Sequence, residues 1–352
     1  MKHNKIAIQF FFIGLIFSLF FTSCQKDEST GVQPASQSRL LLGTSCKITI
    51  YDHPDKEIFE KAFARIEDIE NKMSVNIETS EVSSVNMSAG IAPVEVSEDT
   101  FAVISKALTV SELSGGAFDI TVEPLVDAWG IGSDDARVPS QQEIDSLLPL
   151  IDYKDIVINE DTHTVFLPVE GMGIDLGGIA KGYAADEVAE ILKEEGVEKA
   201  IINLGGNVLT IGSRVDGTPW RIGVQNPDAE RGGHVMILKL EDQALVTSGP
   251  YERYLEVDGK VYHHILDTTT GYPVQTNLTS ASIITRESFI ADALSTAIYS
   301  EGIVKGLELI DSLDSVDAIF IDDQKNIYLS ESFANQQIEY SISNDEFTVK
   351  VP

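Results

Sequence analysis

The sequence has few cysteines, since its 352 residues include only Cys24 and Cys46. Cys24 follows an apolar N-terminal segment and is interpreted below as a site of lipid attachment, which leaves Cys46 alone. An internal disulfide is therefore excluded. Cys46 lies in an apolar, strand-like run, so we expect a buried thiol rather than a reactive one.

Positive charge is scarce as well, because 25 lysines and arginines stand against 56 acidic residues and the formal net charge is -31. A surface this acidic excludes general binding to nucleic acid or to an anionic membrane. A ligand that carries phosphate would need a helix start, a lysine or a metal ion nearby to overcome the repulsion.

The central glycine-rich stretch, Gly173–Asp186 (GIDLGGIAKGYAAD), matches neither of the usual nucleotide-binding patterns, GxxxxGK[ST] and GxGxxG. A β-prone run at 164–167 precedes it and apolar residues at helical spacing at 183–192 follow it, which predicts a strand, a turn and a helix. Gly177 and Gly178 allow a ligand to approach the backbone, or a positive φ. The N–H groups of a helix start favour anions. The alternative is a tight turn that needs glycine for structural reasons alone.

The N-terminal 23 residues are typical of a secretory signal. Lys2 and Lys5 form a positive region, the run 6–21 is almost wholly apolar, and small residues precede Cys24. We therefore expect a lipoprotein signal with lipid attached to Cys24. The alternative, a plain membrane anchor, is disfavoured because the run is short for a membrane span.

Four further stretches accompany the central one: 116–122 (GAFDITV), 203–208 (NLGGNV), 263–274 (HHILDTTTGYPV) and 291–297 (ADALSTA). Together and in this order they resemble the ApbE family, the FAD:protein FMN transferases, over roughly residues 40 to 335. Strands and helices are mixed without a repeated βαβ pattern, so the fold class is α+β. The resemblance implies a single compact, T-fold-type unit of two lobes with the flavin cleft between them.

The chain divides accordingly into four parts: a signal at 1–23, a flexible tether at 24–38, the ApbE-like domain at 39–335 and a peripheral segment at 336–352. Within the domain we expect a first strand over 40–51 that bends at Gly43. We expect helices at 58–73 and at 100–114, the second capped by Ser97, and a strand after the glycine pair Gly115-Gly116.

Several residues are candidates for flavin contacts. The resemblance assigns FAD binding to Ala117, Phe118 and Asp119, although the residues alone fit a turn followed by a core strand equally well. Met73 could touch the flavin or end its helix in the core. We also assign Asp175, Lys181 and Leu266 to the FAD site, with Lys181 and the loop N–H groups holding the pyrophosphate.

Asp292 and Thr296 are candidate metal ligands. They are four residues apart in a predicted helix and therefore share one face. A carboxylate and a hydroxyl are hard oxygen ligands that suit Mg²⁺. Alone, they could equally be an exposed acid and a threonine bonded to its own helix. The resemblance makes both of them ligands, with the carbonyl of Gly178 as the third.

His264 is the candidate base. His263 and His264 are adjacent, so in a strand they point to opposite faces and only one can face a given site. A histidine near its ordinary pKa can take a proton from an acceptor hydroxyl, and Asp267 is the alternative base. The family usually has Asp-Pro where this chain has Asp267-Thr268, which puts the rigidity of the loop in doubt. Arg253 could pair with a phosphate or with a carboxylate of this acidic chain.

The resemblance implies Mg²⁺-dependent transfer of FMN from FAD to a threonine or serine hydroxyl of a target protein, with release of AMP. Two alternatives are an FAD pyrophosphatase, in which water is the acceptor, and a flavin-binding lipoprotein without catalysis. The signal and the lipid would hold the protein at the periplasmic face of the inner membrane. Its acceptors would then be extracytoplasmic segments of membrane redox-pump subunits, or flavin-carrying domains.

Overall fold

The computed structural model describes residues 33–229, 232–331, 333 and 338–350. The predicted signal, Cys24 and the tether up to residue 32 lie outside this part of the chain. The first strand begins at Ala35, so the last residues assigned to the tether belong to the folded domain instead. Among the described residues, no helix is both long enough and apolar enough to cross a bilayer.

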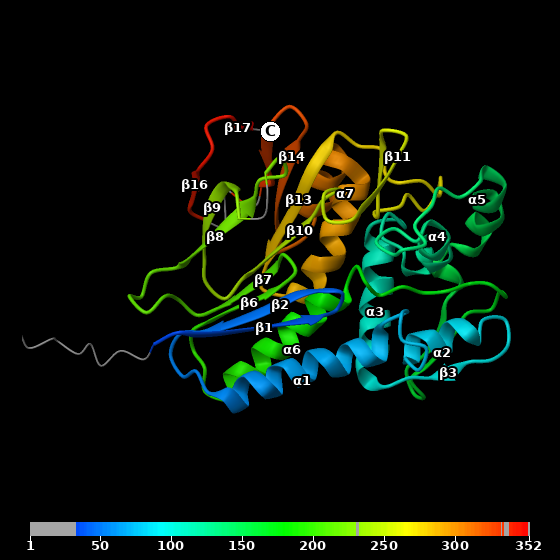
Figure 1. The fold of residues 1–352 in the computed structure, drawn as a ribbon, viewed down its shortest axis with the longest axis horizontal. Coiled ribbons are helices and arrows are strands. Elements are labelled where there is room, and N and C mark those ends of the chain that lie inside the picture. Colours follow the sequence, from blue (N-terminus) through cyan, green and yellow to red (C-terminus); the bar gives the residue numbers. More distant parts are fainter. Residues whose placement is uncertain (1–32, 230–231, 332, 334–337, 351–352) are drawn as a thin grey trace, which may run out of the picture. The chain divides into compact units, whose positions relative to one another are not determined.

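A mixed sheet of nine strands forms the centre of the fold (Figure 1). Its neighbouring strands are antiparallel, except the last pair, which is parallel. In spatial order the strands are β1 (Ala35–Leu41), β2 (Thr44–Ile50), β6 (Ala200–Leu204), β7 (Asn207–Ile211), β10 (Ala244–Ser248), β13 (Leu278–Thr285), β14 (Asp317–Asp322), β15 (Asn326–Leu329) and β17 (Thr348–Lys350).

The predicted first strand, 40–51, is instead the second half of a hairpin. Leu42 and Gly43 have φ of 53° and 65° and form a two-residue turn between β1 and β2. Two successive positive φ angles suit the right-handed twist of a hairpin, and the bend expected at Gly43 is therefore a reversal of the chain.

Two helices pack directly on one face of this sheet, α6 (Ala180–Glu194) and α7 (Ser288–Asp311). The other long helices are α1 (Lys56–Met73) and α3 (Glu98–Leu113), and the short ones are α2 (Glu81–Met87), α4 (Glu123–Trp129) and α5 (Gln141–Leu147). The helices expected at 58–73 and 100–114 are thus present, and Ser97 caps α3 by accepting from the N–H of Thr100. α6 packs against both α1 and α7 (Figure 1).

The core is divided by the central sheet according to the alternation of its side chains. Val246 and Ile283 pack with the helices, whereas their neighbours Leu245 and Ile284 pack on the opposite face. That face is covered by a three-stranded sheet of β8 (Trp220–Gln225), β9 (His234–Leu240) and β16 (Tyr340–Ile342). Successive residues of a strand point to opposite faces, so one strand serves both halves of the core.

Two smaller sheets complete the fold. The hairpin of β11 (Tyr254–Val257) and β12 (Lys260–His263) stands beside the candidate site, and β3 (Val94–Glu95), β4 (Val157–Asn159) and β5 (Thr164–Phe166) form the other sheet. Single 3-10 turns lie at Ile120–Val122, Leu148–Leu150 and Tyr153–Asp155.

Two expectations about these elements were wrong. The segment after Gly115-Gly116 is not a strand but a 3-10 turn that leads into α4, because the carboxylate of Asp119 accepts from the N–H of Thr121 and starts a helical turn. The C-terminal segment is not peripheral either. Residues 340–342 and 348–350 each add a strand to a sheet, and Phe347 between them is buried.

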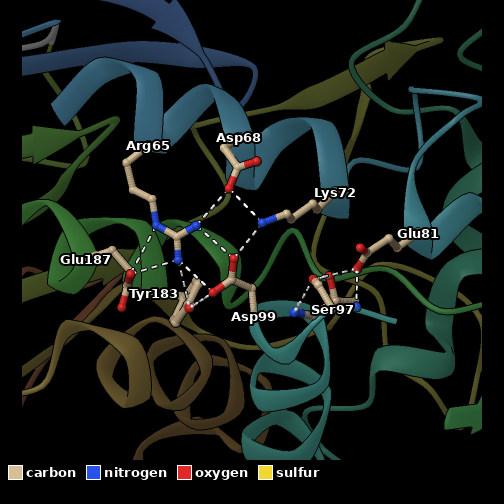
Figure 2. Close-up of polar contacts among 9 residues, drawn as sticks. Arg65, Asp68, Lys72, Glu81, Ser97, Asp99, Tyr183 and Glu187 are labelled. Carbon is tan, nitrogen blue, oxygen red and sulfur yellow. Dashed lines mark hydrogen bonds and ion pairs between the residues drawn. The ribbon is translucent and has the colours of Figure 1, made fainter. Parts of the chain in front are cut away.

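A cluster of charged side chains ties α1, α3 and α6 together (Figure 2). The guanidinium of Arg65 contacts Asp99 with both Nη atoms at 2.7 Å and also binds Glu187. Lys72 reaches the same Asp99 at 2.8 Å. Hydrogen bonding by Arg65 holds the pKa of Asp99 well below its usual range, so the cluster is ionised and stabilising at neutral pH.

Candidate active site

A cavity of about 720 Å³ lies where α1, α6, α7 and the turn before η1 (Ile120–Val122) meet the ends of the central strands. Every candidate site residue named from the sequence within the described part lines it, except Asp267. These are Met73, Ala117, Phe118, Asp119, Asp175, Gly178, Lys181, His264, Leu266, Asp292 and Thr296. Residues from five separate sequence stretches are thus brought to one site.

The central loop is compact because its glycines allow close approach. The N–H of Gly177 donates to Oδ1 of Asp175 at 2.6 Å, and a Cβ on Gly177 would stand 2.9 Å from that oxygen. A Cβ on Gly178 would stand 3.1 Å from the ring of Phe118. Neither glycine has a positive φ, so that reason for glycine is wrong, and the close approach of Asp175 and Phe118 gives both positions a packing reason.

The start of α6 is partly occupied by a side chain of the protein itself. Oδ2 of Asp292 accepts from the N–H of Gly182 at 2.9 Å. Lys181 directs its ammonium to the carbonyl of Gly177 at 2.9 Å and to Asp292 at 3.4 Å. An anion at this helix start would therefore share these groups with the carboxylate of Asp292.

Asp292 and Thr296 lie on the same face of α7 and border the cavity beside Gly178. Both hydrogen bonds that the described residues make to the buried Asp292 carboxylate go to Oδ2. Oγ1 of Thr296 lies 3.4 Å from Oγ of Ser248, and a Cβ on Gly178 would stand 3.8 Å from it. Carboxylate, hydroxyl and backbone oxygens are the donors that Mg²⁺ prefers, so the residues present fit that ion.

No group of three or more histidine, cysteine, aspartate or glutamate side chains within the described ranges could hold a metal. The candidate metal site is of a different kind. It has one carboxylate, from Asp292, and its other donors are the hydroxyl of Thr296 and the backbone carbonyl of Gly178. An ion there would need ligands from its substrate or from water, as Mg²⁺ commonly has.

His264 lines the cavity with a half-buried ring. Its Nδ1 lies 3.2 Å from the main-chain carbonyl of Arg253, which also accepts from the His264 N–H at 3.1 Å. A carbonyl can only accept, so Nδ1 carries the proton and Nε2 is the free base. Burial lowers the pKa of His264 to about 4, which keeps the ring neutral at physiological pH.

His263 is turned away from this cavity, as the alternation of a strand predicts. Its ring is buried and its Nε2 lies 3.0 Å from the carbonyl of Val274. Burial lowers its pKa as well, so it serves as a neutral core histidine. Of the adjacent pair, the structure thus brings only His264 to the site.

The carboxylate of Asp267, the alternative base, makes hydrogen bonds within its own loop. Its Oδ1 accepts from the N–H groups of Thr269 and Thr270 and from the hydroxyl of Thr269, and it borders a neighbouring cavity of about 440 Å³. Thr268, which stands where the family usually has proline, donates its hydroxyl to the carbonyl of Gly116 at 3.1 Å. The loop is therefore anchored by hydrogen bonds instead of by proline.

Both oxygens of the Asp119 carboxylate accept hydrogen bonds within the protein. Oδ1 accepts from the N–H and the hydroxyl of Thr121, and Oδ2 accepts from the N–H of Tyr153 at 2.9 Å. Burial raises its pKa. The side chain of Asp119 thus shapes the turn that presents Ala117 and Phe118 to the cavity.

Two polar residues at the site were not singled out from the sequence. Ser248, at the end of β10, contacts both Ser295 and Thr296 with its hydroxyl, at 2.8 and 3.4 Å. Asn207, beside the turn of the NLGGNV stretch, accepts from Ser288 while its Nδ2 is buried without a partner among the described residues. A glycine pair followed by asparagine was the available signal for the second residue.

Comparison with known proteins identifies the family. The sequence model of the ApbE family matches residues 42–320. The chain belongs to the ApbE family. It is 38% identical over 295 residues to an FAD:protein FMN transferase of Klebsiella pneumoniae, covering 84% of this chain and 91% of that protein. It is 34% identical over 316 residues to one from Treponema pallidum, covering 85% and 87%.

Solved structures of ApbE proteins share the fold. The ApbE protein of Thermotoga maritima superposes with a TM-score of 0.78 at 34% identity, covering 87% of this chain and 100% of that one. The flavin transferase ApbE of Vibrio cholerae gives 0.77 at 28% identity, covering 86% and 99%. The mixed helix-and-strand fold and the ApbE membership expected from the motifs are both confirmed.

Proposed function

We propose that this ApbE-family protein transfers FMN from FAD to a hydroxyl group of an acceptor protein and releases AMP. The observation that carries the proposal is the neutral His264, whose unprotonated Nε2 belongs to the same cavity as Asp292, Thr296 and Lys181. A base that shares a cavity with a lysine and with oxygen atoms that can hold a cation suits the attack of a hydroxyl on a phosphate. Its relatives named FAD:protein FMN transferase support the same reaction.

In the proposed reaction the acceptor oxygen attacks the phosphorus on the FMN side of the pyrophosphate. The new oxygen–phosphorus bond forms as the bond to the bridging oxygen breaks, and AMP leaves with that oxygen. Nε2 of His264 takes the hydroxyl proton. Lys181 and the loop N–H groups would balance the charge on the pyrophosphate, while Phe118 and Met73 would pack against the flavin.

The cofactor that fits the site is Mg²⁺, held by Asp292, Thr296 and the backbone carbonyl of Gly178. When bound, it would neutralise charge on the pyrophosphate and on the departing phosphate. Asp292 is held in place for this by Gly182, and Thr296 by its neighbour Ser248. Asp175 supports the turn that carries Gly177 and Gly178.

The acceptor and the place of action are part of the proposal. The predicted signal and the predicted attachment of lipid to Cys24 support work at the periplasmic face of the inner membrane. The acceptor hydroxyl would then belong to a threonine or serine in an extracytoplasmic segment of a redox-pump subunit, or in a flavin-carrying domain. The acidic chain supports no role with nucleic acid.

The test is to incubate the protein with FAD, Mg²⁺ and a periplasmic flavin-carrying domain and then to weigh that domain by intact mass spectrometry. A gain equal to FMN less water is the expected result. Free FMN and AMP without any gain would point to a pyrophosphatase. Bound FAD with neither product would point to a carrier without catalysis.

A further inference from the structure

Two cationic side chains line the main cavity, Lys181 and Arg253. They differ in the contacts that they make with the rest of the described chain. Lys181 is already engaged with the carbonyl of Gly177 and the carboxylate of Asp292. Its charge is therefore largely balanced before any ligand arrives.

Arg253 has no such partner: none of the ion pairs or side-chain hydrogen bonds found in the described part of the chain involves its guanidinium. Among the described residues Arg221 and Arg286 have no ion pair either, but of these three arginines only Arg253 lines the cavity. Arg65, for comparison, binds Asp68, Asp99 and Glu187. An unpaired guanidinium that lines a cavity is a binding group for an anion.

The surroundings of Arg253 leave room for its side chain. A Cβ on Gly43, in the β1–β2 turn, would stand 3.3 Å from Nη2, and a Cβ on Gly132 would stand 3.3 Å from Cδ. Both glycines have a positive φ, of 65° and 99°. The arginine thus passes close to two glycines that leave room for it. The nearby Glu70 carboxylate accepts from the N–H of Leu42 in the same turn, and among the described residues it forms no ion pair with Arg253.

Arg253 is also linked to the candidate base through its main chain. Its carbonyl accepts from the N–H of His264 and faces Nδ1 of the same ring. The pairing of β11 and β12 fixes this geometry, since Tyr254 lies opposite His263. The side chains of Arg253 and His264 therefore start from backbone positions that are hydrogen-bonded to each other, and both line one cavity.

We propose that Arg253 binds a phosphate group of the flavin dinucleotide and, with Lys181, supplies the positive charge that this acidic protein otherwise lacks. The inference rests on the proposed function, because it takes FAD as the ligand. It resolves the two alternatives for Arg253 in favour of phosphate. A planar guanidinium can donate two parallel hydrogen bonds to one phosphate, which lysine cannot.

Binding measurements test the proposal without any acceptor. The full chain in detergent, with Mg²⁺, is titrated with FAD, ADP and riboflavin by calorimetry. Arg253→Gln is expected to weaken the binding of FAD and of ADP by about 10- to 100-fold, which corresponds to the loss of one charge-assisted hydrogen bond. Riboflavin, which has no phosphate, should bind as it does to the wild type. The affinities of Arg253→Lys for FAD and ADP should lie between those of the wild type and those of Arg253→Gln.

The matched control is Arg221→Gln, which removes an exposed arginine of β8 that does not line the cavity. It should leave all three affinities unchanged. Unchanged FAD affinity in Arg253→Gln would overturn the proposal, and so would an equal loss for riboflavin, which would indicate a structural role. A raised KM for the acceptor with unchanged FAD affinity would assign the guanidinium to the acceptor protein instead.

The proposed function can fail separately. A wild-type protein that binds FAD and ADP but never flavinylates an acceptor would refute the transferase, while the effect of Arg253 on affinity could still be present. The pH dependence of transfer gives a second readout. Its acid limb should lie at slightly higher pH in Arg253→Gln than in the wild type, because the guanidinium charge helps to lower the pKa of His264.

Discussion

Asp292 in α7 accepts a hydrogen bond from the backbone N–H of Gly182 in the first turn of α6, at 2.9 Å. The opposite contact also exists, because Asp186 of α6 accepts from the N–H groups of Ser288 and Phe289 at the start of α7, at 3.1 and 2.8 Å. Each helix thus satisfies free N–H groups of the other. The candidate metal ligand is therefore positioned by the same contact that joins the two helices.

Gly182→Ala should destabilise the protein. A Cβ at this position would overlap the carbonyl oxygen of Ser288 and stand 2.8 Å from Cβ of Asp292. Alanine gains about 1 kcal/mol in helix propensity, but overpacking against backbone costs about 1–3 kcal/mol. We therefore expect a lower free energy of unfolding, measured with urea, and weaker binding of Mg²⁺. Glu190→Ala, exposed on the same helix, is the control, and equal stability of the two variants would contradict the close packing.

Asp292→Asn and Asp292→Ala separate the capping role from the proposed metal role. Asparagine keeps an oxygen for the Gly182 N–H but removes the charge, whereas alanine removes both. AMP release should fall at least about 100-fold in both, since a metal site supplies several kcal/mol. Only alanine should also lower the melting temperature. AMP release that survives either change, measured by chromatography, would refute the metal assignment.

His264 should set a simple pH profile. Because burial lowers its pKa to about 4, the ring is neutral above that pH and protonated below it. The rate of transfer should therefore stay level from pH 8 to about 5 and fall only towards pH 4. His264→Gln should slow transfer by about 10²- to 10⁴-fold with FAD affinity kept. His234→Gln, exposed on β9, is the control. A decline centred near pH 6.5 would contradict the assigned environment.

Glu123 should make the protein less stable as pH rises. Burial, together with the charges of Asp127 and Asp175, raises its pKa to about 7. A carboxyl whose pKa is raised on folding contributes stability below its unfolded pKa and loses it as pH rises through the folded value. Glu123→Gln should therefore be more stable than the wild type at pH 8, by about 1–2 kcal/mol, and equal to it at pH 4. Urea unfolding at both pH values measures this, and no gain at pH 8 would refute it.

Asp99 should behave in the opposite way. Its pKa is held well below the usual range by Arg65, so its contribution is present at neutral pH and is lost as pH falls below about 4. Asp99→Asn should cost about 2–4 kcal/mol at pH 7, because Arg65 and Lys72 lose a partly buried partner, and much less near pH 2. Glu60→Gln, at an exposed ion pair with Arg39, should change nothing measurable. An equal effect of Asp99→Asn at both pH values would contradict the cluster in Figure 2.

Much of the site could be predicted from local spacing. Asp292 and Thr296 share a helix face because a helix returns to the same side after four residues, and His263 and His264 diverge because a strand alternates. The amphipathic pattern of α1 and the capping serine of α3 placed those helices to within a few residues. In each of these cases the deciding interactions lie within a few residues along the chain.

Prediction failed where the deciding partner is distant or unusual. The run at 120–122 looks like a strand by composition but forms a helical turn, because the Asp119 carboxylate is available to start one. The segment at 340–350 is polar and short, and it becomes strand only because β9 and β15 offer free edges.

The sequence by itself thus determined the family, the mixed fold class and many of the candidate residues that gather at the cavity. Only the tertiary structure decided that His264 rather than Asp267 faces the cavity, that Gly182 must lack a side chain, and that Arg253 forms no ion pair with any described carboxylate. These outcomes depend on contacts such as that between Gly182 and Asp292, which are 110 residues apart. Spacing along a chain specifies which side chains share a face, but only packing brings two faces together.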